Sequence, residues 1–251
     1  MSILKSGNPT LTEKIFSKSL SSADEGTMTV RGTLNKFGFI FLMMMASAAY
    51  TWQAFYNGQN VMGYMWGGMI GGFIIALVIT FKRSWSGYLA PLYGLCEGLF
   101  VGAISALINY AMADKYPGII LQAVSLTFGA AIAMFLLYNF RVIRATEKFK
   151  SIIFTATAGI AIFYLIAMVL RMFGIDIPFL HEGSALGIGF SVFVVAIAAL
   201  NLIMDFDMIE AGTAMGAPKH MEWYCAFGLL VTIVWLYIEI LRLLSKIGSR
   251  D

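Results

Sequence analysis

The chain has 251 residues, of which 59% are hydrophobic and only 12% are charged, and its mean hydropathy is +0.80. Soluble proteins carry roughly 45–50% apolar and about 25% charged residues, so a water-soluble globular protein is excluded, because so few charges could not cover so much apolar surface. The net charge of +3 is too small to indicate a nucleic-acid partner. The composition predicts a membrane protein that crosses the bilayer several times.

Seven apolar segments are long enough to cross a bilayer as helices, which takes about 20 residues each. These segments are Phe37–Phe55, Val61–Phe81, Tyr88–Tyr110, Ile119–Phe140, Ile152–Phe173, Ala185–Met204 and Trp223–Leu244. They lack the alternation of polar and apolar residues that membrane β-strands need. The sequence therefore predicts an all-α domain of seven antiparallel transmembrane helices at 33–251, preceded by a polar, flexible cytosolic tail at 1–32.

Lysine and arginine residues set the expected orientation, because cytosolic loops of membrane proteins are enriched in them. An N-terminus in the cytoplasm leaves only five of the 17 basic residues outside: Lys115, Arg171, Arg242, Lys246 and Arg250. We therefore expect a cytoplasmic N-terminus. The basic C-terminus then lies outside, where the rule would not place it. Either Trp223–Leu244 does not cross fully, or the earlier loops fix the orientation.

Small residues recur every four positions in two spans, a pattern that lets helix backbones approach closely in lipid. The second span has Gly63, Gly67 and Gly71, with Gly68 and Gly72 alongside, and the third has Gly94, Gly98 and Gly102. These rows predict a tightly packed bundle rather than chemistry.

Ionisable side chains inside a membrane are costly, so they are candidates for function. Glu97 lies roughly 12 Å into the third span at 1.5 Å per residue, with no basic residue between Tyr88 and Tyr110. It is either a proton-sensitive group or a protonated carboxyl that is hydrogen-bonded across a helix interface. Glu239 interrupts the last span, with Arg242 three residues later. It either pairs with Arg242 or faces a central cavity.

Further acidic residues close the sixth span. Asp205 and Asp207 point about 200° apart on a helix, so they cannot face the same cavity. Asn201 lies one turn before Asp205 and shares its face, whereas Asp207 shares the opposite face with Glu210. We favour Asp205 as the inward-facing group. The alternative is that all three carboxylates are solvated.

Motifs typical of enzymes are missing from the sequence. It has no His-Glu-x-x-His, no Gly-x-Ser-x-Gly and no phosphate-binding loop with a lysine. Both intramembrane aspartates lie on one span, which does not suit an aspartyl protease. Cys96 and Cys225 lack Cys-x-x-Cys spacing and are expected to be free thiols. We expect no enzyme activity, no cofactor and no assigned metal site.

Several stretches resemble the bacterial branch of the Bax inhibitor-1 superfamily. They are Met28–Thr33, Ala90–Phe100, Met204–Asp207, Trp223–Tyr224, Trp235–Glu239 and Leu241–Leu244. The resemblance implies a last helix that is central, with six others wrapped around it. It also implies a pH-sensitive calcium leak, gated by two aspartates on the sixth and seventh helices that share a proton. Asp205 matches the first of these positions, and Glu239 falls on the second.

The spacing of these two acids departs from the pattern. In an antiparallel hairpin, Asp205 and Glu239 are level only if the tip falls near Glu222, whereas Gly216 and Pro218 put it near residue 217. The resulting offset is about nine residues, or roughly 13 Å. Either the sixth helix continues past Gly216 or Asp205 meets another group, of which Glu97 is the obvious one.

Two functions remain open. The first is a bacterial inner-membrane protein that passes cations under proton control. The carboxylates would be Asp205, Glu239 and Glu97, with Asp207, Arg242 and Asn201 secondary. Hard oxygen ligands suit calcium, but they also suit sodium and protons, so calcium rests on the resemblance. The alternative is an interaction protein that modulates a membrane protease or another stress component. Deleting residues 1–27 should leave ion flux intact, but it should abolish a partner-binding role that uses the tail.

Overall fold

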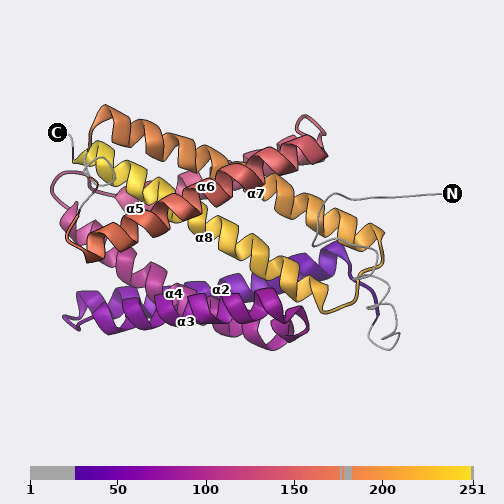
Figure 1. Ribbon diagram of the computed structural model, residues 1–251. Helices are drawn as coiled ribbons and strands as arrows, with labels where there is room; N and C mark the ends of the chain where they lie inside the picture. Colours follow the sequence, from indigo (N-terminus) through magenta and orange to yellow (C-terminus); the bar gives the residue numbers. More distant parts are fainter. Residues whose placement is uncertain (1–25, 176, 178–182, 250–251) are drawn as a thin grey trace.

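The computed structural model describes residues 26–175, 177 and 183–249, and these contain seven α-helices that are all long and apolar enough to cross a membrane. The helices are α2 (Val30–Tyr56), α3 (Met62–Phe81), α4 (Ser86–Ala111), α5 (Ile119–Asn139), α6 (Glu147–Met172), α7 (Ala185–Ala214) and α8 (Met221–Gly248) (Figure 1). A 3₁₀ turn at Arg83–Trp85 joins α3 to α4. The prediction of an all-α protein with seven spans is confirmed.

Local sequence signals define where several of these helices begin and end. Side chains of Thr29, Thr146 and Ser184 accept the first free backbone N–H groups of α2, α6 and α7, which is the usual role of hydroxyl residues at a helix N-cap. Gly118 before α5 and Gly216 after α7 adopt positive φ angles of 80° and 67°, which glycine adopts without steric cost. Short turns of this kind make successive helices antiparallel.

Helix α8 is the most buried of the seven. Within its most apolar stretch 67% of residues are buried, against 44% for α7 and 11–39% for the others. It packs against α2, α4, α5 and α7, whereas α3 packs mainly on α4 and α6 mainly on α7. A last helix with all six others wrapped around it stays a prediction.

The helices extend beyond the apolar segments predicted from sequence. Helix α7 ends at Ala214 rather than Met204, and α2 begins at Val30 rather than Phe37. Hydropathy marks only the part of a helix that suits lipid, and polar residues continue the same helix into the interface. Asp205, Asp207 and Glu210 therefore lie within α7 rather than at or beyond its end.

A short N-terminal strap, residues 26–29, is hydrogen-bonded to the turn between α7 and α8. The Met28 N–H donates to the Ala217 carbonyl at 2.7 Å, and the Lys219 N–H donates to the Gly26 carbonyl at 3.2 Å. The Met28 side chain is buried in the core. The polar tail predicted for 1–32 therefore ends earlier than expected, because this segment folds against the hairpin. Residues 1–25 lie outside the described part of the chain.

Glycines let α4 approach both α2 and α3 closely. A Cβ at Gly98 would overlap the Ser47 side chain and the Met44 carbonyl of α2, and one at Gly68 would overlap the Cys96 carbonyl of α4. Gly63 and Gly67 have no such neighbour within 4 Å. The second span thus approaches α4 most closely at Gly68 and Gly72, and a Cβ at Gly71 would contact Cys96 Sγ at 3.4 Å.

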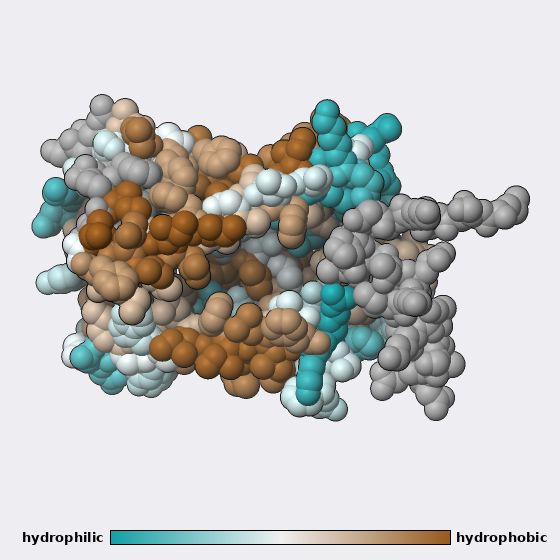
Figure 2. All heavy atoms as spheres, in the orientation of Figure 1, coloured by the Kyte–Doolittle hydropathy of each residue, from teal (hydrophilic) through white to brown (hydrophobic). Residues whose placement is uncertain are grey.

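On the face drawn in Figure 2, hydrophobic side chains cover much of the middle, and hydrophilic ones gather toward the two ends. The start of α2 and the α7–α8 turn lie at one end of the bundle, and α8 finishes at the other (Figure 1). This arrangement suits a multi-pass membrane protein whose outer surface faces lipid.

Candidate functional site

Asp205 of α7 faces α8 in the half of the α7–α8 hairpin that is nearer the turn. Its Oδ1 atom would lie 4.0 Å from a Cβ placed at Gly228, and the Thr232 side chain is its hydrogen-bonding neighbour. Its other oxygen, Oδ2, is the single buried side-chain oxygen or nitrogen that lacks a hydrogen-bond partner within the described residues. A buried carboxylate without a partner is strongly disfavoured, so this environment favours the neutral acid.

Glu239 of α8 lies in a fully paired environment instead. Its side chain is 2% exposed, and the Tyr164 hydroxyl of α6 donates to its carboxylate, lying 3.1 Å from each oxygen. Arg242 Nη1 donates to the same oxygens at 3.2 and 3.3 Å and to the Tyr164 hydroxyl at 2.6 Å. The guanidinium also lies over the Tyr164 ring, 4.9 Å from its centroid. Such a triad holds an ionised glutamate.

The structure does not bring Asp205 and Glu239 together. Asp205 is level with Gly228 and Thr232, and Glu239 follows Thr232 by seven residues, which is about 10 Å along the helix axis. Helix α7 ends at Ala214, so it does not continue past Gly216 to bring the two acids level. The offset expected from the turn signals is therefore present.

Glu97 is not the group that meets Asp205. It lies on α4 facing α3, where a Cβ at Gly72 would come within 3.0 Å of its Oε2 atom. Its hydrogen-bonding neighbour is Tyr93, one turn earlier on α4. The Tyr93 ring packs edge-on against Phe227 of α8, with centroids 4.8 Å apart. Glu97 thus forms a separate polar site near the interface of α3 and α4, linked to α8 by Tyr93.

The secondary candidates other than Arg242 bind helices next to α7. Asn201 donates to the Thr157 hydroxyl of α6 at 2.9 Å and to the Ile197 carbonyl at 2.8 Å. Its bonds therefore tie α7 to α6, whereas Asp205 faces α8. Asp207 pairs with Lys150 at 2.8 Å.

Glu210 lies one turn after Asp207 and belongs to the same end of the bundle. It accepts hydrogen bonds from the Tyr138 hydroxyl and from Arg141. The bond to Glu210 raises the pKa of Arg141, which keeps this surface pair ionised. Asp207 and Glu210 thus hold the ends of α5 and α6 against α7.

The sequence interpretation missed Glu222, a fully buried carboxylate at the start of α8. It accepts hydrogen bonds from the backbone N–H and the hydroxyl of Thr29, each at 2.9 Å. It also pairs with Lys36 and with Lys219. Only Lys219, three residues before it, is a local signal, because Thr29 and Lys36 are nearly 200 positions away in the sequence.

Lys246 is a second buried charge that sequence reasoning counted as an outside charge. Its ammonium donates to the Gly187 carbonyl at 3.0 Å and to the Ser191 hydroxyl at 2.8 Å, both at the start of α7. Lys246 is thus bound within the bundle, whereas the Arg242 side chain pairs with Glu239 and is 37% exposed.

Metal-ligating side chains do not gather into a cluster in the described part of the chain. No group of three or more His, Cys, Asp or Glu side chains is arranged there to hold a metal ion. Both cysteines are free, with Cys225 buried and Cys96 partly buried. The hydrogen-bonding neighbours of Asp205 and Glu97 are uncharged, a threonine and a tyrosine, whereas Glu239 pairs with Arg242.

Comparison with known proteins identifies a family for nearly the whole chain. The model of the family described as Bax inhibitor 1 like matches residues 8–249. Searches of curated proteins and of solved structures give no match.

Proposed function

Because this chain belongs to the Bax inhibitor-1-like family, we propose that it is a proton-controlled cation leak channel and that calcium is the ion that crosses. It would lie in the bacterial inner membrane with its N-terminus in the cytoplasm. The observation that carries the proposal is the buried Asp205 Oδ2 atom, which has no hydrogen-bond partner in the described residues.

Asp205 is the proposed proton switch. In the packed hairpin its neutral acid is tolerated, because one oxygen has Thr232 beside it and the other carries little charge. Loss of the proton leaves a buried anion, which must gain water or a cation to be stable. Separation of α7 from α8 would supply both. The closed state is therefore favoured at low pH and the open state at high pH.

Glu239 is the proposed second binding site for the cation. Arg242 and Tyr164 already neutralise its charge, so a cation would have to displace Arg242 to bind there. Breaking a buried ion pair without a substitute is costly, and an arriving cation is such a substitute. Oxygen ligands of this kind suit calcium.

The separation of the two acids favours two independent groups over a pair that shares one proton. Carboxylates perturb each other strongly when they are within about 4–6 Å, and the helical rise puts Asp205 and Glu239 about 10 Å apart along the axis. Glu97, beside Tyr93, would add a third and weaker proton-dependent contribution.

Basic residues at the α2-start end of the bundle support a cytoplasmic N-terminus. Lys36 and Lys219 surround Glu222, Arg83 lies over Tyr224, and Lys150 pairs with Asp207. At the opposite end Arg242 pairs with Glu239, and Lys246 donates to uncharged groups of α7. These two basic residues are fewer than the four at the α2-start end, so the charge rule favours a cytoplasmic N-terminus.

The test is calcium entry into liposomes that contain the purified full chain, at about pH 6 and about pH 8, on either side of neutrality. Wild-type flux should be higher at the higher pH. Asp205→Asn keeps an uncharged side chain at both values, so its flux should stay at the low-pH level. Asp114→Asn, at an exposed loop position, is the matched control.

The other two acids give distinguishable results in the same assay. Glu239→Gln should lower flux at both pH values while the pH dependence remains, with exposed Glu147→Gln as its control. Glu97→Gln should reduce the pH dependence only in part. Flux no higher than that of empty liposomes at either pH would overturn the channel proposal and leave the interaction role to be tested.

A further inference from the structure

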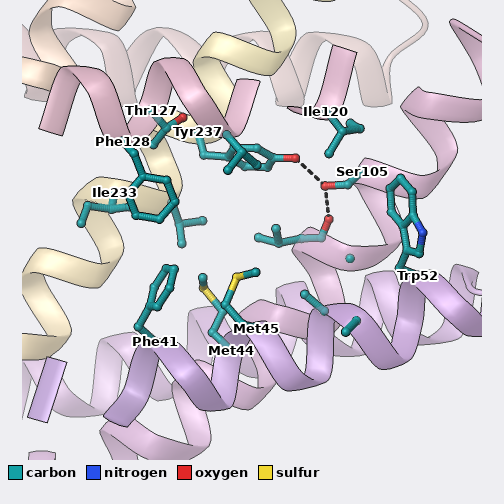
Figure 3. Close-up of a pocket in the computed structure, with 16 residues that line it drawn as sticks. Phe41, Met44, Met45, Trp52, Ser105, Ile120, Thr127, Phe128, Ile233 and Tyr237 are labelled. Carbon is teal, nitrogen blue, oxygen red and sulfur yellow. Dashed lines mark hydrogen bonds between the residues drawn. The ribbon is translucent and has the colours of Figure 1, made fainter. Parts of the chain in front are cut away.

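An apolar pocket opens between α2, α4, α5 and α8, and none of the three acids described above lines it. Its volume is about 290 Å³. Phe41, Met44 and Met45 of α2 point into it from one side, and Phe128, Ile233 and Tyr237 line the other (Figure 3). Apolar cavities of about 150 Å³ already bind small apolar molecules, so this pocket is large enough for a ligand.

The hydroxyl groups in its wall are satisfied by the protein itself. The Ser105 and Tyr237 hydroxyls bond to each other at 2.7 Å, and Thr127 donates to the Ala123 carbonyl at 2.7 Å. A retained water needs two to four polar partners, and these groups offer few. The wall therefore favours an apolar occupant over water.

The mouth of the pocket is continuous with the lipid-facing surface of the spans. Met45 and Phe128 line the pocket, yet they are 46% and 43% exposed. At one end the rings of Phe41 and Phe128 meet edge-on, 5.9 Å apart, and bridge α2 to α5. The remaining opening faces the hydrocarbon core of the bilayer, which consists mainly of phospholipid acyl chains.

We infer that this pocket binds one acyl chain of a bilayer phospholipid, inserted laterally between α2 and α5. The chain would contact Ile233, Val234 and Tyr237 of α8, close to Thr232, the neighbour of Asp205. Bilayer composition would thereby affect the packing of the helix that carries Glu239. This inference does not depend on the proposed channel function.

Retention of lipid in detergent tests the inference. The full chain is reconstituted with a phospholipid that carries a dibrominated acyl chain, exchanged into detergent and assayed for bound phospholipid. Wild type should keep one equivalent. Ala49→Phe fills the pocket from α2 and should retain about tenfold less, because each lost methylene contact weakens binding severalfold. Ala46→Phe, at an exposed α2 position outside the pocket, should behave as wild type.

Tryptophan quenching by the retained bromine atoms gives a second measurement that does not depend on the filled variant. Trp52 lines the pocket, so Trp52→Phe should remove most of the quenching. Trp66→Phe changes an exposed residue of α3 and should leave it in place. No retained phospholipid, equal retention by both Ala→Phe variants, quenching unaffected by Trp52→Phe, or an extracted occupant other than a phospholipid would each overturn the inference.

Discussion

Asp205 and Glu239 lie on adjacent helices, yet their surroundings favour opposite protonation states. Glu239 has a guanidinium and a phenol within hydrogen-bonding distance, and these stabilise a carboxylate. Asp205 has a threonine beside it and one oxygen without a partner, which favours the acid. Under the function proposed above, this difference makes Asp205 the proton switch and leaves Glu239 paired with Arg242.

Tyr164→Phe should test the pairing of Glu239 directly. The change removes the hydroxyl that donates to Glu239 and accepts from Arg242, and we expect a loss of about 1–3 kcal/mol in the free energy of unfolding, the cost of leaving buried polar groups unsatisfied. Equilibrium unfolding in mixed micelles measures it. Tyr88→Phe, where the side chain is 87% exposed, should change little. Equal stability of both variants would contradict the described triad.

Local spacing predicted some contacts of these residues and could not predict others. The Glu239–Arg242 pair follows from an i, i+3 spacing on one helix. The contact of Glu239 with Tyr164 joins α6 to α8, and the burial of Glu222 depends on Thr29 and Lys36 from the other end of the chain. A single sequence gives the depth of an acid in its own span, but not which helix faces it.

At the level of elements, the strap and the start of α8 form one buried polar junction. Thr29 caps α2 through its side chain, which bonds to the Gly32 N–H, and also donates to Glu222. Gly32 leaves the space that the Glu222 carboxylate occupies. The stretch Met28–Thr33 thus has a physical role: it fixes the N-terminus of α2 to the hairpin that carries Asp205.

Gly32→Ala should destabilise this junction. Its Cβ would overlap the Glu222 carboxylate, and displacing that group from Lys36, Lys219 and Thr29 should cost about 3 kcal/mol, as for other broken buried ion pairs. Gly38→Ala lies on the same helix with nothing within 4 Å. It should be neutral or stabilising by up to about 1 kcal/mol. The free energy of unfolding of both variants, measured in mixed micelles, tests this prediction. An equal change in the two variants would contradict the contact between Gly32 and Glu222.

The number and type of these elements followed from sequence, whereas their ends and faces did not. Seven apolar runs predicted seven helices because lipid demands about 20 apolar residues. Helix α7 was predicted ten residues too short, since hydropathy falls at Asp205 while the helix continues. Both glycine rows of the second span were named from sequence, and spacing alone does not show that Gly68 and Gly72 approach α4 most closely.

For the whole molecule, an odd number of complete crossings would place the two ends of the described chain on opposite sides of the membrane. The start of α2 and the end of α8 lie at opposite ends of the bundle (Figure 1). Arg242, which pairs with Glu239 and is 37% exposed, and Lys246, which is buried against the start of α7, both lie near this end of α8.

Reporter fusions after Gly248 should report an outside location in bacterial cells. Alkaline phosphatase, which folds only outside the cytoplasm, should be active there, and a fluorescent protein that matures only inside should stay dark. A fusion in the α5–α6 turn near Arg144 should give the reverse result. Cytoplasmic reporters active at both positions would contradict seven complete crossings.

Observing the Asp205 proton itself tests most directly whether this residue is the proton switch. Infrared difference spectra of the reconstituted protein should contain a carboxylic-acid carbonyl band at low pH that disappears as the pH rises. We predict that Asp205→Asn removes this band and that Asp114→Asn leaves it. The pH midpoint of the band should coincide with the pH midpoint of calcium entry. A band that survives in Asp205→Asn, or a midpoint unrelated to the flux, would contradict the claim that Asp205 controls the channel.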